Sequence, residues 1–231
     1  MLELRNIRAG YGRFQVLHGL NLVVPEDSTV ALLGANGAGK TTLLKVAAGL
    51  LRPSGGDVVL DGETVTTRPA YQRTRRGVCL VPEGRGIFRQ LTVRENLAMY
   101  AGGRNVKEAI DQAVVAFPIL KDRLGQVAGT LSGGQQQMLA VSRALVSEAP
   151  LILADELSVG LAPVVVDEIF EAVSQLRAAG RSLLIVEQYV SRALAVADYV
   201  YILHKGRVAF VGEPEQCEDG HVFEQYVGSV A

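Results

Sequence analysis

Short apolar runs alternate along the chain with longer segments in which apolar residues recur every three or four positions. Such alternation is typical of an α/β fold, in which buried strands are connected by helices that pack on the sheet. Three apolar runs predict buried strands, at Thr29–Leu33, Leu151–Ala154 and Ser182–Val186. Between the last two, Pro163 and Gly180 mark the expected start and end of a helix with one apolar face.

The N-terminal part follows a different pattern. Apolar and polar residues alternate over Leu2–Ile7 and over part of Val16–Val24, which predicts a small, half-exposed antiparallel sheet. From about Glu83 to Ser147 the strand patterns disappear and helical patterns dominate. We therefore predict a helical lobe inserted into the α/β core.

We expect residues 1–231 to form a single domain, because this length suits one substantial core. The predicted core comprises residues 1–82 and 148–214, and the helical lobe comprises residues 83–147. A short, mostly polar tail is expected over residues 215–231.

Composition narrows the classes of protein to consider. Hydrophobic residues make up 48% and charged residues 20%, as in an ordinary folded domain, which excludes wholesale disorder. No apolar run reaches the length that crosses a bilayer, and Met1–Arg5 lacks the features of a signal peptide. The net charge of −1 gives no reason to expect binding to nucleic acid. Cys79 and Cys217 lack metal-ligand spacing, and the apolar stretch around Cys79 favours a buried free thiol there, which fits a reducing cytoplasm.

The strongest motif follows the first predicted strand. The residues Gly34-Ala35-Asn36-Gly37-Ala38-Gly39-Lys40-Thr41 match G-x-x-x-x-G-K-[ST], the phosphate-binding P-loop. Glycines let the backbone turn its N–H groups toward phosphate oxygens, and the helix that begins at Lys40 adds the positive end of its dipole. Lys40 supplies a charge for the β- and γ-phosphates of ATP, Thr41 supplies a hydroxyl for Mg²⁺, and Thr42 completes the predicted ATP-binding set. A glycine-rich turn that binds nothing is the alternative, but the position between a buried strand and a helix favours the P-loop.

Two carboxylates follow the predicted strand Leu151–Ala154. Asp155 and Glu156 would lie at the carboxyl end of that strand, where open α/β sheets bind their ligands. There Asp155 can hold Mg²⁺ through water, and Glu156 can orient and polarise the water that attacks the γ-phosphate. A solvated pair that caps the next element is the alternative, and the P-loop makes it the weaker interpretation.

A second glycine-rich turn precedes the helix expected over Gln136–Val146. Its residues are Leu131-Ser132-Gly133-Gly134-Gln135. A serine and two glycines before a helix form another anion-binding turn. One nucleotide does not need two phosphate-binding turns so far apart in one chain. Two copies facing head-to-tail would use both, with the P-loop of each copy completed by Ser132 and Gly134 of the other.

The order of these motifs resembles the ATPases of ABC transporters, in which Leu-Ser-Gly-Gly-Gln is the signature motif. The resemblance implies a RecA-like P-loop core, a small N-terminal antiparallel β-subdomain, an inserted helical subdomain and a nucleotide-sandwich dimer that binds ATP and Mg²⁺. It further implies that Tyr11 stacks on adenine and that Gly133 and Gln135 join Ser132 in the ATP contact. The segment Ser158–Leu161 resembles the loop through which one site senses the other.

Several positions depart from the general ABC pattern, and together they resemble one branch of the family. Glu83 stands where most members have a Gln that contacts Mg²⁺ and the membrane partner, and Gln188 stands where most have a switch His. The segment Leu161-Ala162-Pro163 lacks the usual Asp. With Gln137–Ala140, these features resemble the second ATPase of bacterial importers for branched-chain amino acids, and of the similar urea and short-chain amide systems.

The departure at Gln188 bears on catalysis. A carboxamide donates only a neutral hydrogen bond, whereas an imidazole can carry a positive charge, and charge-assisted bonds are roughly twice as strong. We therefore expect Gln188 to contact the γ-phosphate more weakly than a His, so that this site hydrolyses ATP with Glu156 as base but less efficiently. Leu157, where this branch has Pro, mainly frees the backbone and should not abolish activity.

The resemblance also predicts partners. It implies a groove for a cytoplasmic helix of the permease in the stretch from Glu83 to about Met99, with Ile87, Phe88 and Leu91 as apolar anchors. The same residues can equally form the core of the helical lobe. The chain would pair with a second ATPase or with itself, and would reach the cytoplasmic face of the inner membrane through permease subunits. A solute-binding protein would act indirectly, and no nucleic acid is expected.

Basic residues gather before and within the predicted helical lobe. They are Arg73, Arg75, Arg76, Arg85, Arg89, Arg94 and Arg104. We interpret them as a solvated face, because a nucleic-acid patch would need interleaved aromatic residues and a net positive charge. His204 is expected beside a hairpin turn at Lys205-Gly206.

Three other functions share some of these motifs. A soluble ABC ATPase acting on DNA or ribosomes would carry a long coiled-coil insertion or two fused cassettes, and the chain has neither. A small-molecule P-loop kinase has no use for the signature motif. A regulator that no longer hydrolyses ATP is disfavoured by Lys40, Asp155 and Glu156, although Gln188 and Glu83 leave it open. Branched-chain amino acids are expected as the solute through the resemblance alone, because this subunit does not contact the solute.

Overall fold

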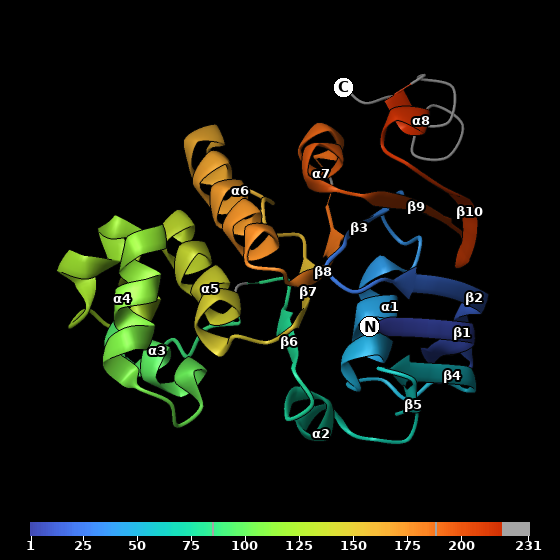
Figure 1. Cartoon of the computed structure of the whole chain (residues 1–231), viewed down its shortest axis with the longest axis horizontal. Helices are drawn as coiled ribbons and strands as arrows, with labels where there is room; N and C mark the ends of the chain where they lie inside the picture. Colours follow the sequence, from blue (N-terminus) through green and yellow to red (C-terminus); the bar gives the residue numbers. More distant parts are fainter. Residues whose placement is uncertain (85, 188, 219–231) are drawn as a thin grey trace.

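The computed structural model describes residues 1–84, 86–187 and 189–218, so Gln188 and Arg85 lie outside the described residues (Figure 1). The strands are β1 Leu2–Tyr11, β2 Phe14–Val24, β3 Thr29–Leu33, β4 Gly55–Leu60, β5 Glu63–Thr64, β6 Val78–Val81, β7 Leu151–Asp155, β8 Ser182–Val186, β9 Tyr199–His204 and β10 Arg207–Gly212. The α-helices are α1 Lys40–Ala48, α2 Ala70–Thr74, α3 Val93–Ala101, α4 Val106–Ala116, α5 Gly133–Ser147, α6 Pro163–Ala178, α7 Val190–Val196 and α8 Glu215–Glu218. Two 3₁₀ helices are η1 Pro118–Arg123 and η2 Ala128–Thr130.

The larger sheet has the strand order β10-β9-β3-β8-β7-β6. Strand β3 pairs in parallel with β8 and β9, and β7 pairs in parallel with β6 and β8. Every residue of β3, β7 and β8 is buried, as expected for strands that are covered on both faces. The three predicted buried strands are therefore confirmed. Strand β7 extends one residue beyond the predicted run, so Asp155 is its last residue.

The N-terminal part forms the smaller antiparallel sheet, with the order β2-β1-β4-β5. Leu2, Leu4 and Ile7 of β1 are buried, whereas Arg5 and Arg8 are exposed, which confirms the predicted alternation. The buried side chains of this sheet share one core with α1 and with strands of the larger sheet. Helix α1 therefore packs against both sheets, and Figure 1 shows it beside β1 and β2.

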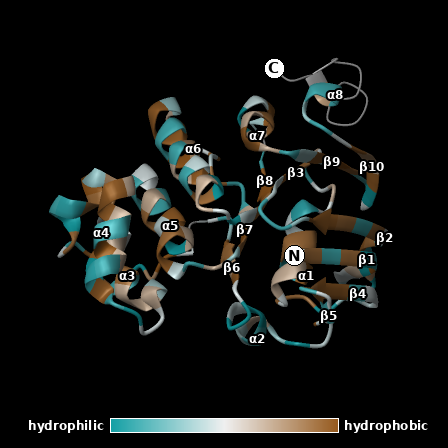
Figure 2. Ribbon diagram, viewed as in Figure 1, coloured by the Kyte–Doolittle hydropathy of each residue, from teal (hydrophilic) through white to brown (hydrophobic). Residues whose placement is uncertain are grey.

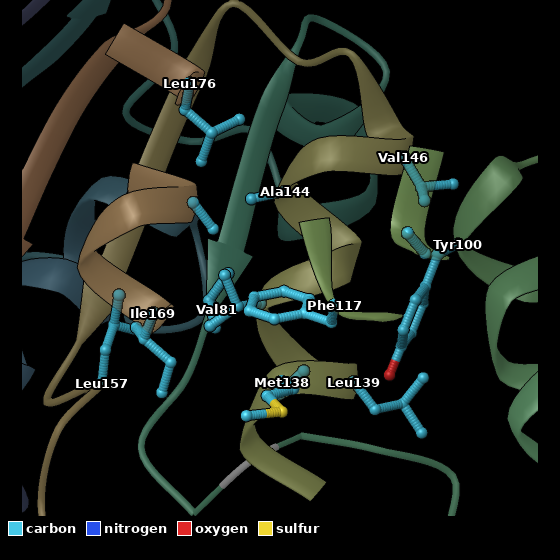
Figure 3. Close-up of a cluster of buried hydrophobic side chains, with 14 of the residues drawn as sticks. Val81, Tyr100, Phe117, Met138, Leu139, Ala144, Val146, Leu157, Ile169 and Leu176 are labelled. Atoms are coloured by element: carbon cyan, nitrogen blue, oxygen red, sulfur yellow. The ribbon is translucent and has the colours of Figure 1, made fainter. Parts of the chain in front are cut away.

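Helices α3, α4 and α5 gather at the end of the molecule opposite the smaller sheet (Figure 1). Hydrophobic and hydrophilic residues both occur along these helices, as expected for helices with one buried face (Figure 2). Their core includes Tyr100, Phe117 and Leu139, and it continues through Ile169 of α6 toward the larger sheet (Figure 3). The residues described between β6 and β7 thus form the predicted helical lobe. Its limits at residues 83 and 147 stay a prediction.

Helix α5 begins at Gly133, three residues before the predicted start at Gln136. Ser132 is its N-cap residue: the Ser132 side chain accepts a hydrogen bond from the Gln135 N–H, and the Gln135 side chain accepts one from the Ser132 N–H. This capping box compensates for the low helix propensity of the two glycines in the first turn.

The prediction that Arg73 belongs to a solvated face is wrong. Arg73 is 1% exposed, and its guanidinium donates hydrogen bonds to the carbonyl oxygens of Val46, Ala47 and Val65 at 2.6, 2.8 and 2.9 Å. Two of these carbonyls belong to the last turn of α1, where a cation also stabilises the helix dipole. Burial lowers the pKa of Arg73 to about 10. The arginine therefore fixes the C-terminal end of α1 within the core.

The start of the predicted polar tail packs onto the core. Cys217 of α8 is fully buried in a cluster with Ala31 and Leu33 of β3. Cys79 is buried as well, which confirms the buried free thiol predicted there, whereas the burial of Cys217 is a finding of the structure. In the part of the chain that the structure describes, no helix combines the length and apolar character needed to cross a bilayer.

Candidate nucleotide-binding site

The P-loop between β3 and α1 adopts a backbone that requires glycine. Gly34, Gly37 and Gly39 have φ angles of 149°, 79° and 109°, in the left-handed half of conformational space. A Cβ on Gly34 would lie 2.3 Å from the carbonyl oxygen of Leu203, and one on Gly39 would lie 2.9 Å from a methyl group of Leu17. The loop is therefore held tightly between β9 and β2.

A hairpin turn supports the loop from behind. Lys205 and Gly206 join β9 to β10 with φ angles of 45° and 74°, as a two-residue hairpin turn requires, which confirms the turn predicted beside His204. The Gly206 N–H donates to the Ala38 carbonyl at 2.9 Å, and the His18 N–H donates to the Gly206 carbonyl at 2.9 Å. The P-loop, β2 and this hairpin thus form one hydrogen-bonded unit.

Lys40 lies inside the curve of the loop. Its Nζ donates hydrogen bonds to the carbonyl oxygens of Gly34 at 2.7 Å and Ala35 at 3.2 Å. Burial lowers the pKa of Lys40, while the negative charges of Glu156 and Asp155 oppose that shift. Ala35, Asn36 and Gly37 are exposed, so the crest of the loop is open above the lysine.

Side chains from three segments meet at the carboxyl end of β7. The Thr41 hydroxyl donates to Asp155 Oδ1 at 3.3 Å. Asp155 is 3% exposed, and burial raises its pKa to about 6. The charges of Glu156 and Glu83 act in the same direction, whereas the Thr41 hydrogen bond and the charge of Lys40 act against it. Glu83 reaches this group because β6 pairs with β7 and ends two residues before it.

The donor atoms at this point suit a magnesium ion. The Thr41 hydroxyl and the buried Asp155 carboxylate are oxygen ligands within hydrogen-bonding distance of each other. The Glu83 carboxylate is exposed and close enough to influence the Asp155 pKa. Mg²⁺ prefers oxygen ligands and is usually held by one or two carboxylates together with phosphates. The residues present therefore fit the ion that the P-loop motif implies.

Glu156 follows β7 in a strained conformation. Its φ angle is 50°, which a residue with a Cβ adopts at some cost in free energy. The Glu156 N–H donates to the Val186 carbonyl of β8 at 2.9 Å, and this bond holds the residue at the edge of the sheet. The side chain is half-buried beside Asp155 and Lys40. Strain of this kind is common at functional sites, where the surrounding structure fixes one conformation.

The loop after Glu156 is anchored by two buried side chains. The hydroxyl of Ser158 donates to the carboxylate of Glu187, and both residues are buried. Leu157 is 2% exposed and packs in the core of the helical lobe with Ile169 (Figure 3). The substitution of Leu for Pro thus adds a core side chain, an effect beyond the freer backbone that the sequence indicated.

Tyr11 lies at the end of β1, near Lys45 of α1. The Lys45 Nζ is 5.9 Å from the centroid of the Tyr11 ring, and the ring is partly exposed. Phe14, its partner across the hairpin, is 82% exposed. The structure therefore offers an aromatic face beside the P-loop helix.

The signature turn lies in the helical lobe, apart from the P-loop. Figure 1 shows α5 among α3, α4 and α6, whereas α1 lies beside the smaller sheet. Ser132 is exposed, and Gly133 and Gly134 form the first turn of α5. The atoms nearest to a Cβ on Gly134 would be the methyl groups of Val165, at 3.1 Å. The two glycine-rich turns therefore occupy different parts of the chain, as the motif order predicted.

The structure brings together the predicted catalytic and metal-binding residues that it describes. Lys40, Thr41, Asp155, Glu156 and Glu83 meet around the P-loop, and Thr42 is buried in the same helix. Gln188 lies outside the described residues.

Two neighbours of the site were missed from the sequence. Glu187 anchors the loop after Glu156, and Arg143 of α5 donates to the carbonyl oxygens of Leu80 and Gly86, on either side of Glu83. A charged residue that follows an apolar strand, or that lies in an amphipathic helix, does not show in the sequence which distant groups it will bond.

Comparison with known proteins agrees with the geometry. The sequence model that describes the ABC transporter family matches residues 17–159, which include the P-loop, the signature turn and Glu156. A high-affinity branched-chain amino acid transport ATP-binding protein of Pseudomonas aeruginosa, BraG, is 42% identical over 90% of this chain and 91% of its own. A probable branched-chain amino acid transport ATP-binding protein of Archaeoglobus fulgidus, LivF, is 38% identical over 97% of both chains.

Proteins with other solutes match as well. The lipopolysaccharide export system ATP-binding protein LptB of Haemophilus influenzae is 35% identical over 99% of this chain and 97% of its own. A solved structure of an ATP-binding subunit of an ABC transporter superposes with a TM-score of 0.83, at 29% identity, over 97% of this chain and 92% of that chain. The family match covers more than half of the chain, so the chain belongs to the ABC transporter family and is an ATPase subunit of a transporter.

Proposed function

We propose that the chain hydrolyses ATP to energise an importer of branched-chain amino acids. The names of the relatives at 42% and 38% identity support this solute class. The relative at 35% identity serves lipopolysaccharide export, so a cell-envelope export ATPase is the second candidate. Urea or a short-chain amide is the third, because the departures at Glu83 and Gln188 also resemble those importers.

The observation that carries the ATPase proposal is the meeting of Lys40, Thr41, Asp155 and Glu156. A lysine inside a glycine loop and a hydroxyl against a buried carboxylate are what the binding of a nucleotide triphosphate requires. Glu156 adds a carboxylate held in one strained conformation at the edge of that group. This arrangement supports hydrolysis and disfavours a purely regulatory protein.

ATP would bind with its phosphates over the exposed crest of the loop. Backbone N–H groups of residues 35–41 would donate to the phosphate oxygens. Lys40 would exchange the carbonyls of Gly34 and Ala35 for oxygens of the β- and γ-phosphates. Tyr11 would stack on the adenine base, and such stacking discriminates little among bases.

Thr41, Asp155 and Glu83 would hold Mg²⁺, which neutralises phosphate charge when bound. Glu156 would accept a hydrogen bond from the attacking water and orient it toward the γ-phosphorus. A bond from the water oxygen to phosphorus then forms as the bond between the γ-phosphorus and the bridging oxygen breaks. The products are ADP and inorganic phosphate, and the proton of the water passes toward Glu156.

A second cassette would complete the site. Ser132 and Gly134 at the start of α5 would donate to the γ-phosphate held by the P-loop of the other cassette. That cassette would be a copy of this chain or a different, His-containing ATPase. Gln188 would contact the γ-phosphate held by the P-loop of its own chain, with a neutral hydrogen bond. ABC cassettes dimerise and work with membrane permeases, and this general property supports the proposed pairing.

The permease would contact the exposed part of the helical lobe. Phe88 is 43% exposed and Met99 is 57% exposed, whereas Ile87 packs partly on the lobe core. This difference favours Phe88 and Met99 over Ile87 as apolar anchors. Docking on permease subunits would place the chain at the cytoplasmic face of the membrane.

Uptake in cells tests the proposed solute. A bacterial strain that lacks its own second branched-chain ATPase but keeps the permeases would receive the chain or its Glu156→Gln variant. We expect the chain, and not the variant, to restore uptake of radiolabelled leucine without changing urea uptake. Rescue of a strain depleted of its lipopolysaccharide export ATPase, with no leucine uptake, would instead support the second candidate.

A further inference from the structure

Arg143 lies near the middle of α5, the helix that begins with the signature turn. Its guanidinium donates to the carbonyl oxygen of Leu80 at 3.2 Å and to that of Gly86 at 2.8 Å. Leu80 belongs to β6, and Gly86 lies in the loop that follows. Glu83 lies between the two bonded residues, so one side chain holds both flanks of the segment that carries it.

The same guanidinium contacts an aromatic ring of α3. Its central carbon lies 4.7 Å from the ring centroid of Tyr100, which is 7% exposed. A guanidinium over an aromatic face at this distance is a favourable cation–π contact. Arg143 therefore links α5, the Glu83 loop and α3 at one point.

From Tyr100 the contacts continue to the surface. The Tyr100 hydroxyl donates to Asn96 Oδ1 at 3.4 Å, and Asn96 is fully buried. Asn96 accepts a hydrogen bond from the Phe88 N–H at 2.8 Å and donates one to the Phe88 carbonyl at 3.0 Å. The rings of Phe88 and Tyr100 lie 6.4 Å apart between centroids. Phe88 itself is 43% exposed, so this chain of contacts ends at the surface.

We propose that Arg143 is a positioning residue that makes the Glu83 loop, the start of α5 and the Phe88 surface move as one unit. Binding of MgATP at Glu83 then changes the surroundings of Phe88 through Arg143, Tyr100 and Asn96. The inference rests on the proposed function, in which Glu83 contacts the nucleotide site. It deepens that function by naming the side chain that carries the change to the surface.

Packing alone does not explain these contacts. Met138, Leu139 and Val146 bury α5 in the core of the lobe without the guanidinium (Figure 3). The Arg143 bonds add a connection to the backbone of two residues that flank the site. A contiguous set of contacts is not evidence of coupling by itself, so a direct test is needed.

The absence of tryptophan from the sequence makes such a test possible. A Phe88→Trp variant carries a single tryptophan at the end of the contact chain, and its emission reports the surroundings of residue 88. Calorimetry on the same sample measures ATP affinity independently. A Val115→Trp variant is the control for position, because Val115 is 79% exposed on α4.

We expect MgATP to change the emission of Phe88→Trp and not that of Val115→Trp. Adding Arg143→Met should abolish the change while ATP affinity stays the same. Adding Arg104→Met should leave the change intact. Arg104 is the matched control, because it also contacts α5, through the Val146 carbonyl, and pairs with Glu148 beyond the helix.

An undiminished emission change in the Arg143→Met protein would overturn the inference, as would ATP binding to Phe88→Trp with no change in emission. If Arg143→Met does not fold, Arg143→Lys decides, because a lysine keeps the charge but cannot bond both carbonyls in the same way. A full response in that variant also overturns the inference. Failure of ATP to bind at all in calorimetry would instead overturn the proposed function, and the inference with it.

Discussion

The two glycine-rich turns of the chain are built in opposite ways. The P-loop is held by β2, β9 and the 205–206 hairpin turn, and Gly34 and Gly39 adopt positive φ angles where a Cβ would strike the backbone or a core side chain. The signature turn is the regular first turn of a helix, with an ordinary capping box and an exposed serine. Contacts within the chain fix the backbone of the P-loop, whereas the serine of the signature turn is exposed to solvent.

This difference suggests that the two turns need glycine for different reasons, one for folding and the other for activity. At Gly34 the backbone and the neighbouring Leu203 carbonyl demand glycine for the fold itself. At Gly134 the three atoms nearest to an added Cβ all belong to the Val165 side chain, which would have to move by a few tenths of an ångström. If Gly134 is needed for activity, the reason lies outside this chain, in a phosphate bound by another cassette.

The largest effect is expected from a substitution that changes the chemical step and leaves both glycine-rich turns unaltered. Glu156→Gln should lower the rate of ATP hydrolysis by about 10²–10⁴-fold, because the neutral amide cannot accept the proton of the attacking water. Neither turn is altered, so ATP-dependent dimers should persist and accumulate. Measurements of phosphate release and of size by gel filtration check both parts. Unchanged phosphate release would show that Glu156 has no catalytic role.

The comparison itself is tested by two matched glycine substitutions. Gly34→Ala should lower the free energy of unfolding by about 3 kcal/mol or more, because the new Cβ meets a carbonyl oxygen in a strained conformation. Gly134→Ala should change it by about 1 kcal/mol or less, since alanine also improves helix propensity. Urea unfolding curves give both values. A large loss of stability in Gly134→Ala would remove the contrast between the two turns.

A smaller effect is expected at the adenine side of the P-loop. Tyr11→Ala should weaken ATP binding by about 1–3 kcal/mol, through loss of stacking on the base. GTP binding should weaken by a similar factor, because every base has an aromatic face. Phe14→Ala is the control, since Phe14 is the exposed partner of Tyr11 across the hairpin. Equal losses in both variants would argue against a specific role for Tyr11.

The γ-phosphate contact offers a gain of function. Gln188→His should raise the hydrolysis rate by about two- to tenfold, because an imidazole can make a charge-assisted bond. The added rate should fade as pH rises through the range in which histidine loses its charge. Steady-state rates between pH 6 and 8.5 check this expectation. Hydrolysis that is unchanged at every pH would contradict the role assigned to Gln188.

The smallest effect is expected at Cys217, which lies outside both glycine-rich turns and affects only the stability of the fold. Burial raises the pKa of the Cys217 thiol to about 11. A group whose pKa is raised by folding contributes stability below its unfolded pKa, and that contribution is lost as pH rises from about 9 toward 11. The free energy of unfolding should therefore fall more in the wild-type chain than in Cys217→Ser between these pH values. Parallel urea titrations check it, and equal slopes would contradict the shift.

Much of the fold could be predicted because its signals are local. Continuous apolar runs gave β3, β7 and β8, and the alternation gave the smaller sheet. The start of α5 was placed too late, because two glycines look like helix breakers while the Ser132–Gln135 capping box offsets them. Local patterns thus predict elements better than their ends.

The contacts made by buried and partly buried arginines could not be predicted in the same way. Arg73 and Arg143 bond carbonyl oxygens from distant segments, and the sequence holds no sign of which carbonyls will be near. The burial of Ile87 and Phe88 could not be predicted either: Ile87 packs on the lobe core, whereas Phe88 is partly exposed. Such facts depend on tertiary structure, which decides the surroundings of each side chain.

Complementation between two inactive variants tests the central claim most directly. Lys40→Ala spoils the P-loop and leaves the signature turn, whereas Gly134→Asp places a negative charge at the signature turn and leaves the P-loop. Each variant alone should be inactive, and a mixture of the two should hydrolyse ATP, because a mixed dimer contains one site with both turns intact. Wild-type activity in Gly134→Asp alone, or no activity in a mixture of folded variants when the wild-type chain is active, would contradict the account.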